Sequence, residues 1–159
     1  MEKNCLVIID VQEQFRYDGF DDLVDRIIAE TKSGVYGNVI AVVLHNDKES
    51  PFYRLTGWHG CVLSESRKMP DKLVNVVDSV FIKHGNSAAT PEVREYLKAE
   101  GITHCFLCGM DTYNCVLSSA FALFDNGTRV TLLSELCSSR HHKDLHGAAV
   151  SIAACAINA

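Results

Sequence analysis

Short apolar runs alternate with segments of helical periodicity along this chain of 159 residues. Five runs are apolar for most of their length and predict strands buried in a parallel sheet; they are residues 4–10, 39–44, 80–83, 104–108 and 128–133. Between them, apolar residues recur at helical spacing, which predicts helices at residues 20–33, 91–99, 116–126 and 143–157. The alternation predicts an α/β fold in which helices cover both faces of the sheet.

Residues 45–78 carry the weakest periodicity of the chain. This segment mixes aromatic residues, glycines and charges, most densely in residues 51–60, which include Trp58. Irregular segments of this length in a small domain are often binding loops or lids. We therefore interpret it as a pocket wall or lid, with a surface excursion anchored by buried rings as the alternative.

Three residues with potentially reactive side chains lie at the ends of predicted strands. Asp10 follows the first run, Lys83 follows the third, and Cys115 follows the turn after the fourth. Ligands of open parallel sheets bind beyond the carboxyl ends of the strands, so an acid, a base and a thiol are expected at one edge. Each residue alone has a simpler interpretation: a cap for Asp10, a solvated strand end for Lys83, a structural thiol for Cys115.

The position of Cys115 predicts a nucleophile. It lies in the first turn of a predicted helix, where free backbone N–H groups and the helix dipole favour a thiolate. Such a terminus moves a thiol pKa down by roughly one unit, and the ammonium of Lys83 is expected to lower it further.

Composition limits the class of protein. Hydrophobic residues make up 47% and charged residues 22%, which is typical of one globular domain spanning residues 1–159. The net charge of −5 argues against nucleic acid or an anionic membrane as a partner. No signal peptide or membrane-spanning run is evident, so we expect a cytoplasmic protein that acts on a small-molecule substrate.

Cysteine usage also favours a reducing compartment. Seven cysteines without a secretory signal are expected to be reduced thiols. Cys105 and Cys108 have the spacing of a redox or zinc motif, but residues three apart on a strand point to opposite faces. We therefore do not interpret them as a pair.

Three motifs together resemble the isochorismatase-like cysteine hydrolases, a family that includes nicotinamidases and N-carbamoylsarcosine amidohydrolases. Residues 10–15 (DVQEQF) are similar to the first signature of the family, residues 80–87 (VFIKHGNS) to its lysine strand, and residues 109–116 (GMDTYNCV) to its cysteine turn. Order and spacing agree along nearly the whole chain. The resemblance implies a Rossmann-like, three-layer α/β/α domain of five or six strands, the sixth being a remnant at residues 156–158.

The resemblance also implies roles for single residues. It implies a catalytic triad of Asp10, Lys83 and Cys115, a cis peptide between Met110 and Asp111, and an oxyanion hole made by the backbone N–H groups of Asp111 and Cys115. We add substrate pocket residues by their positions: Phe15, Tyr113 and Trp58. The implied activity is hydrolysis of the C–N bond of a small amide or carbamoyl substrate through a thioester, without a cofactor, in a homo-oligomer (a dimer or tetramer).

Metal ligands of the family are not matched. Metal-binding amidases carry an Asp-x-His pattern after the second strand, where this chain has His45-Asn46-Asp47-Lys48. No metal is therefore expected, although His45, Asp47 and His59 could form an irregular site. Arg16, Arg54 and Arg67 are candidates to anchor a substrate carboxylate, with surface charge as the simpler interpretation of each.

Three other functions stay open at this point. The first is the ether hydrolysis of isochorismate, which relatives perform without the thiol. The second is a catalytically silent binding or scaffold protein that kept the pocket. The third is a metal protein built on Cys137, His141, His142 and His146, for which the simpler interpretation is a polar loop and helix start.

Overall fold

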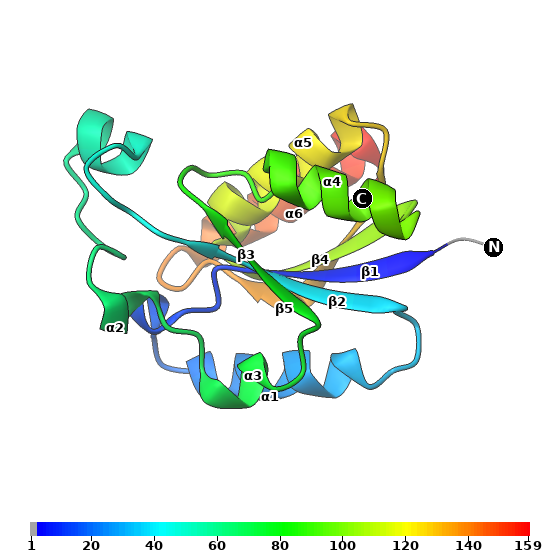
Figure 1. The fold of residues 1–159 in the computed structure, drawn as a ribbon, viewed down its shortest axis with the longest axis horizontal. Coiled ribbons are helices and arrows are strands. Elements are labelled where there is room, and N and C mark those ends of the chain that lie inside the picture. Colours follow the sequence, from blue (N-terminus) through cyan, green and yellow to red (C-terminus); the bar gives the residue numbers. More distant parts are fainter. Residues whose placement is uncertain (1–2) are drawn as a thin grey trace.

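The computed structural model describes residues 3–159 as one parallel sheet between two layers of helices (Figure 1). The strands run in the order β3-β2-β1-β4-β5, and all neighbours are parallel. They are β1 (Asn4–Ile9), β2 (Asn38–Leu44), β3 (Ser79–Lys83), β4 (His104–Met110) and β5 (Arg129–Ser138). The predicted α/β/α architecture is confirmed, with five strands in the described part of the chain.

Helices cover both faces of this sheet. Figure 1 shows α1 and the short α3 on one side and α4, α5 and α6 on the other. The long helices are α1 (Phe20–Thr31), α4 (Pro91–Glu100), α5 (Leu117–Asp125) and α6 (Lys143–Ile157); α2 (Ser64–Arg67) and α3 (Asp71–Val74) are single turns. Among residues 3–159, no helix is long and apolar enough to cross a membrane.

The central strands form the core because both of their faces are covered. Every residue of β1 after Asn4 and every residue of β2 after Asn38 is buried. On one side, α1 packs Phe20, Leu23 and Ile27 against them, each at most 1% exposed. Burial on both faces explains why these strands read as unbroken apolar runs.

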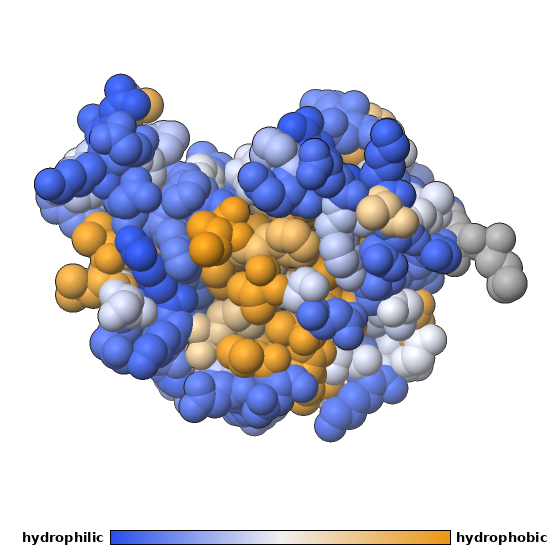
Figure 2. Space-filling model, in the orientation of Figure 1, coloured by the Kyte–Doolittle hydropathy of each residue, from blue (hydrophilic) through white to orange (hydrophobic). Residues whose placement is uncertain are grey.

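Strand β3 differs from the prediction that it is buried like the first strand. It lies at the edge of the sheet, and its Val80 and Ile82 are 47% and 46% exposed. Figure 2 shows an apolar surface over β3, and Val74 of α3 is exposed as well. Alternation along a strand turns Phe81 and Lys83 to the opposite face, where Lys83 is buried.

The end of the chain differs from one prediction and decides one alternative that the sequence left open. Strand β5 continues beyond the expected residue 133 to Ser138 after a break in register: Leu107 pairs with Leu132, but Gly109 pairs with Cys137. The polar residues Ser134 and Glu135 interrupt the apolar pattern and hide this continuation. Of the five or six strands that the resemblance implied, the described residues form five. Helix α6 spans the residues predicted to be helical, continues through Ile157, and packs Ala149 and Ala153 into the core.

Candidate active site

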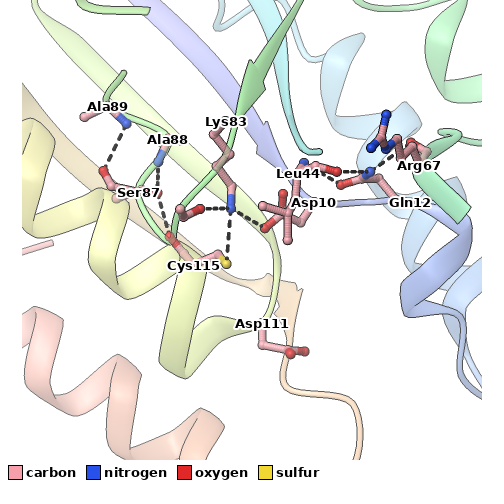
Figure 3. Close-up of polar contacts among 12 residues, drawn as sticks. Asp10, Gln12, Leu44, Arg67, Lys83, Ser87, Ala88, Ala89, Asp111 and Cys115 are labelled. Carbon is pink, nitrogen blue, oxygen red and sulfur yellow. Dashed lines mark hydrogen bonds and ion pairs between the residues drawn. The ribbon is translucent and has the colours of Figure 1, made fainter. Parts of the chain in front are cut away.

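Asp10, Lys83 and Cys115 meet at the carboxyl edge of the sheet (Figure 3). The Nζ atom of Lys83 lies 2.8 Å from Asp10 Oδ2 and 3.3 Å from Cys115 Sγ. It also donates a hydrogen bond of 2.8 Å to the carbonyl oxygen of Gly85. All three side chains are buried: Asp10 and Lys83 are 1% exposed and Cys115 is 6% exposed. The structure thus brings together the three residues that were predicted from separate strand ends.

Strand order explains how the three side chains reach one another. Asp10 follows the central strand β1 with a left-handed backbone (φ 53°), and its N–H donates to Val42 of β2. Lys83 ends β3, which lies two strands from β1. Its long flexible side chain covers that separation, which a shorter cation would not.

The turn that carries Cys115 depends on a close approach of β4 to β1. Gly109 has φ 116°, and a Cβ atom there would lie 2.1 Å from the carbonyl oxygen of Ile9, so only glycine fits. The peptide bond between Met110 and Asp111 is cis, as the resemblance implied. A π-helical turn over Thr112–Val116 then places Cys115 ahead of α5.

The electrostatics of the thiol correct the sequence prediction. Burial raises the pKa of Cys115 well above its ordinary value, the Asp10 carboxylate raises it further, and Lys83 lowers it only in part. The net shift of the Cys115 pKa is therefore opposite to the predicted lowering, although Lys83 itself acts in the predicted direction. Because the site excludes water and holds a carboxylate, a thiol rather than a thiolate is the resting form at neutral pH.

The pKa values of Asp10 and Lys83, which lie beside the thiol, are raised as well. Burial raises the pKa of Asp10, with Lys83 opposing it. Burial lowers the pKa of Lys83, but Asp10 and Cys115 outweigh that effect and the net direction is up. Lys83 is thus an ammonium ion, and its charge opposes the rise in the Asp10 pKa that burial causes.

A cavity of about 330 Å³ opens beside Cys115. Its wall includes all three predicted pocket residues, Phe15, Tyr113 and Trp58. The rings of Phe15 and Trp58 are nearly parallel, at 6° with centroids 6.2 Å apart. Phe52 meets Trp58 edge to face at 5.5 Å and also lines the cavity. A volume of this size suits a small molecule with a flat group.

Part of the irregular segment is therefore a wall of the cavity, as expected. Asn46 holds the segment in place: its side-chain amide donates to the carbonyl oxygens of Trp58 and Gly60, at 2.7 and 2.9 Å. Gly60 is required there, because a Cβ atom would lie 2.0 Å from the indole of Trp58. These contacts fix the indole that faces Phe15.

Gln12 joins this region to the sheet. Its buried side chain accepts from the N–H of Leu44 and donates to the carbonyl oxygens of Leu44 and Arg67 (Figure 3), at 2.7, 3.0 and 2.8 Å.

We expect Gln12→Leu to lower the free energy of unfolding by about 2–4 kcal/mol, since it leaves buried backbone groups without partners. Urea denaturation measures this.

The matched control is Gln14→Leu. Gln14 is exposed and accepts one hydrogen bond, from Cys61 N–H, so a loss of less than about 1 kcal/mol is expected. Equal losses in both variants would mean that Gln12 does not anchor the segment.

Arg140 is a residue of the cavity wall that sequence reasoning missed. Its guanidinium forms a bidentate pair with Asp111, with Nε–Oδ1 at 2.8 Å and Nη2–Oδ2 at 2.5 Å. It also lies over the ring of Phe15, 5.1 Å from the centroid. The register break in β5 carries the chain to this position, and no apolar pattern in the sequence signals that break.

The arginines named from the sequence are engaged elsewhere. Arg16 pairs with Glu13 and Asp21, and Arg67 donates to the carbonyl oxygens of Cys61 and Asn46. Neither these nor Arg54 line the cavity.

The alternative metal sites are not assembled. Within residues 3–159, no group of three or more His, Cys, Asp or Glu side chains is arranged to hold a metal ion. His59 stacks on Tyr53, while His146 hydrogen-bonds Thr112 and Cys137 contacts the Leu107 carbonyl. All seven cysteines are free thiols, including Cys105 and Cys108.

Comparison with known proteins agrees with this geometry. The sequence pattern of the isochorismatase domain matches residues 4–157. "Isochorismatase domain-containing protein 2" of Xenopus laevis is 37% identical over 65 residues, which are 40% of this chain and about a third (32%) of that protein.

Solved structures share the fold over almost the full length. The nicotinamidase/pyrazinamidase of Bacillus subtilis superimposes with a TM-score of 0.84 at 21% identity, covering 99% of this chain and 97% of that chain. The N-carbamoylsarcosine amidase of Thermoplasma acidophilum gives a TM-score of 0.76 at 20% identity, covering 96% and 93%. With the domain pattern matched along nearly its whole length, this chain belongs to the isochorismatase family.

Proposed function

We propose that the protein is a cysteine-dependent hydrolase that cleaves the C–N bond of a small amide or carbamoyl substrate. The observation that carries the proposal is the contact of Lys83 Nζ with both Asp10 Oδ2 and Cys115 Sγ at the wall of a cavity of suitable size. Relatives in fold named as a nicotinamidase and an N-carbamoylsarcosine amidase support the same reaction class.

In the proposed reaction the thiol is activated only as it attacks. Because the resting thiol is protonated, Asp10 accepts its proton while the sulfur of Cys115 bonds to the carbonyl carbon. Lys83 stabilises the negative charge that this transfer places on sulfur. The backbone N–H groups of Asp111 and Cys115 are proposed to stabilise the oxyanion.

The intermediate then divides into products. The C–N bond breaks, and Asp10 returns the proton to the leaving nitrogen, which departs as ammonia or an amine. Water attacks the thioester, Asp10 takes one proton from it, and the acid leaves with regeneration of the thiol. The nearly parallel rings of Phe15 and Trp58 favour a substrate with a flat acyl or carbamoyl group.

An acyl adduct on Cys115 tests this proposal directly. The protein is incubated with a panel of small amides and carbamoyl amines, quenched in acid, and examined by intact and peptide mass spectrometry. An added acyl mass on the Cys115 peptide, together with release of ammonia or amine, is the expected result. Ether hydrolysis of isochorismate without such an adduct, or turnover of no substrate, would instead favour one of the alternative functions.

The pH dependence of activity follows from the direction of the Asp10 shift. Only the ionised carboxylate accepts the thiol proton, and burial raises the pKa of Asp10. Activity is therefore present above this raised pKa and is lost as the pH falls through it. We expect the acid limb of kcat/KM to have its midpoint above about 3.9, the ordinary value of aspartate, while circular dichroism shows the fold intact.

A second readout checks the state of the thiol. The difference in thiolate absorbance at 240 nm between the wild type and Cys115→Ala is expected to stay near zero from pH 6 to 8, because the pKa of Cys115 is raised. A thiolate signal from Cys115 at pH 7 would contradict activation during attack.

A further inference from the structure

The charges around the cavity cancel in two pairs. Among the residues that line it, Asp10, Asp111 and Arg140 are charged. Asp10 is paired with Lys83, and Asp111 is paired with Arg140. The thiol adds no charge at neutral pH because its pKa is raised. The cavity is therefore close to neutral, although it contains an arginine.

The ion pair with Asp111 occupies much of the Arg140 guanidinium that a ligand could otherwise contact. Two of its N–H groups point to the two oxygens of Asp111 in a fork arrangement, which is the geometry that a substrate carboxylate would use. The face of the guanidinium rests on Phe15. Asp111 thus takes the place that an anionic group of a ligand would otherwise occupy.

This pair is also shielded from water. The side chain of Asp111 is 9% exposed and that of Arg140 is 28% exposed. In such surroundings charges interact more strongly than at the surface, so an additional anion would face the carboxylate of Asp111 without a free cation to balance it.

From this arrangement we infer that Asp111 is a specificity-determining residue: by neutralising Arg140, its carboxylate restricts the site to uncharged amides and disfavours substrates that carry a carboxylate. The inference deepens the proposed function and rests on it. It assigns a role to the Asp111 side chain that is separate from the proposed role of its backbone N–H group.

Two electrophiles of nearly equal shape test the inference without knowledge of the substrate. Iodoacetamide is neutral, and iodoacetate is an anion at neutral pH. In each reaction the sulfur of Cys115 bonds to the methylene carbon, iodide leaves with the electron pair, and the thiol proton passes to Asp10 and then to solvent. Peptide mass spectrometry gives the rate at each cysteine, and the exposed Cys155 serves as the internal reference.

The rate ratio of iodoacetamide to iodoacetate is the measured quantity. In the wild type we expect this ratio to be higher at Cys115 than at Cys155. Asp111→Asn keeps the shape of the side chain but leaves the charge of Arg140 unbalanced, so the ratio at Cys115 is expected to fall at least tenfold, equivalent to about 1.4 kcal/mol. The double variant Asp111→Asn/Arg140→Gln is expected to return the ratio toward that of the wild type.

Two further variants keep the test decisive. Arg140→Gln alone leaves the carboxylate of Asp111 unbalanced and is expected to raise the ratio at Cys115, which gives an independent result if Asp111→Asn does not fold. Asp125→Asn removes an exposed carboxylate at the end of α5 that does not line the cavity. It is expected to leave the ratio unchanged.

The outcomes separate the two proposals. If Cys115 is alkylated but its ratio is the same in the wild type, Asp111→Asn and Arg140→Gln, the inference about Asp111 is overturned and the proposed nucleophile stands. If neither reagent modifies Cys115 in the folded protein, the accessible nucleophile is refuted, and the inference that rests on it is refuted with it.

Discussion

Replacement of Cys115 with alanine is expected to abolish amide hydrolysis, with kcat reduced by at least about 10⁴-fold. In the proposed reaction this sulfur forms the bond to the carbonyl carbon, and among residues 3–159 no other thiol lines the cavity. Loss of a nucleophile typically removes most of the catalysis provided by the residues that act with it. Ammonia release from the best substrate of the amide panel measures the effect.

The fold is expected to survive this substitution. Cys115 is buried, and removal of one sulfur atom leaves a small cavity, for which a loss of about 1 kcal/mol in the free energy of unfolding is typical. Binding of the substrate, measured by calorimetry, should therefore persist while turnover is lost.

Two other cysteines provide controls. Cys155 is exposed on α6, and Cys137 is buried in β5, and neither lines the cavity. Alanine at either position should leave kcat within about twofold of the wild type, because surface substitutions and substitutions distant from the site act mainly on stability. Turnover retained by Cys115→Ala would show that another residue is the nucleophile.

The positions of the three central site residues could be predicted because they depend on topology alone. In a parallel sheet the carboxyl ends of the strands lie at the same edge. Asp10 follows β1, Lys83 ends β3, and Cys115 lies in the turn after β4. Burial on both faces also gives such strands a clear apolar pattern. Both features can be recognised in the sequence without knowledge of the strand order.

Features that depend on the position of a strand within the sheet could not be predicted. The apolar run that ends at Lys83 is similar to a buried strand, yet β3 is an edge strand with two exposed side chains. The second half of β5 lies beyond a break in register and carries Arg140 to the cavity. Tertiary pairing, which leaves no periodic signal, decides both.

The direction of the pKa shift of Cys115 could not be predicted from the sequence, for a different reason. A helix terminus and a nearby ammonium are visible as sequence positions, and both lower a thiol pKa. Desolvation depends on how completely the surroundings exclude water, and the carboxylate of Asp10 acts against the ammonium. Their sum has the opposite sign to the prediction, because the depth of burial appears only when the chain is folded.

Replacement of Lys83 is expected to have the second large effect, a loss of stability. Lys83→Met keeps the length and apolar stem of the side chain but removes the ammonium that contacts Asp10, Cys115 and the Gly85 carbonyl. A carboxylate that is 1% exposed is then left without its partner. At neutral pH we expect the free energy of unfolding to fall by about 3–5 kcal/mol, measured by urea denaturation.

A surface pair supplies the matched control. Lys72 lies 2.6 Å from Asp25, but the two side chains are 44% and 67% exposed. The same substitution, Lys72→Met, should cost less than about 1 kcal/mol, because water replaces the lost partner. The contrast between the two lysines therefore measures the effect of burial on an otherwise similar ion pair.

The pH dependence of the Lys83→Met loss identifies its cause. Burial raises the pKa of Asp10, and Lys83 opposes that rise in the wild type, so its removal raises the pKa further. A carboxyl group whose folded-state pKa lies above its unfolded value of about 3.9 stabilises the fold most at low pH, and that stability is lost as the pH rises through the folded value. The loss in Lys83→Met should accordingly be smallest near pH 4 and grow toward pH 8, while Asp10→Asn/Lys83→Met should recover most of it at pH 8. A loss that is independent of pH, or that persists in the double variant, would mean that the packing of the lysine stem, rather than the unpaired carboxylate, governs the effect.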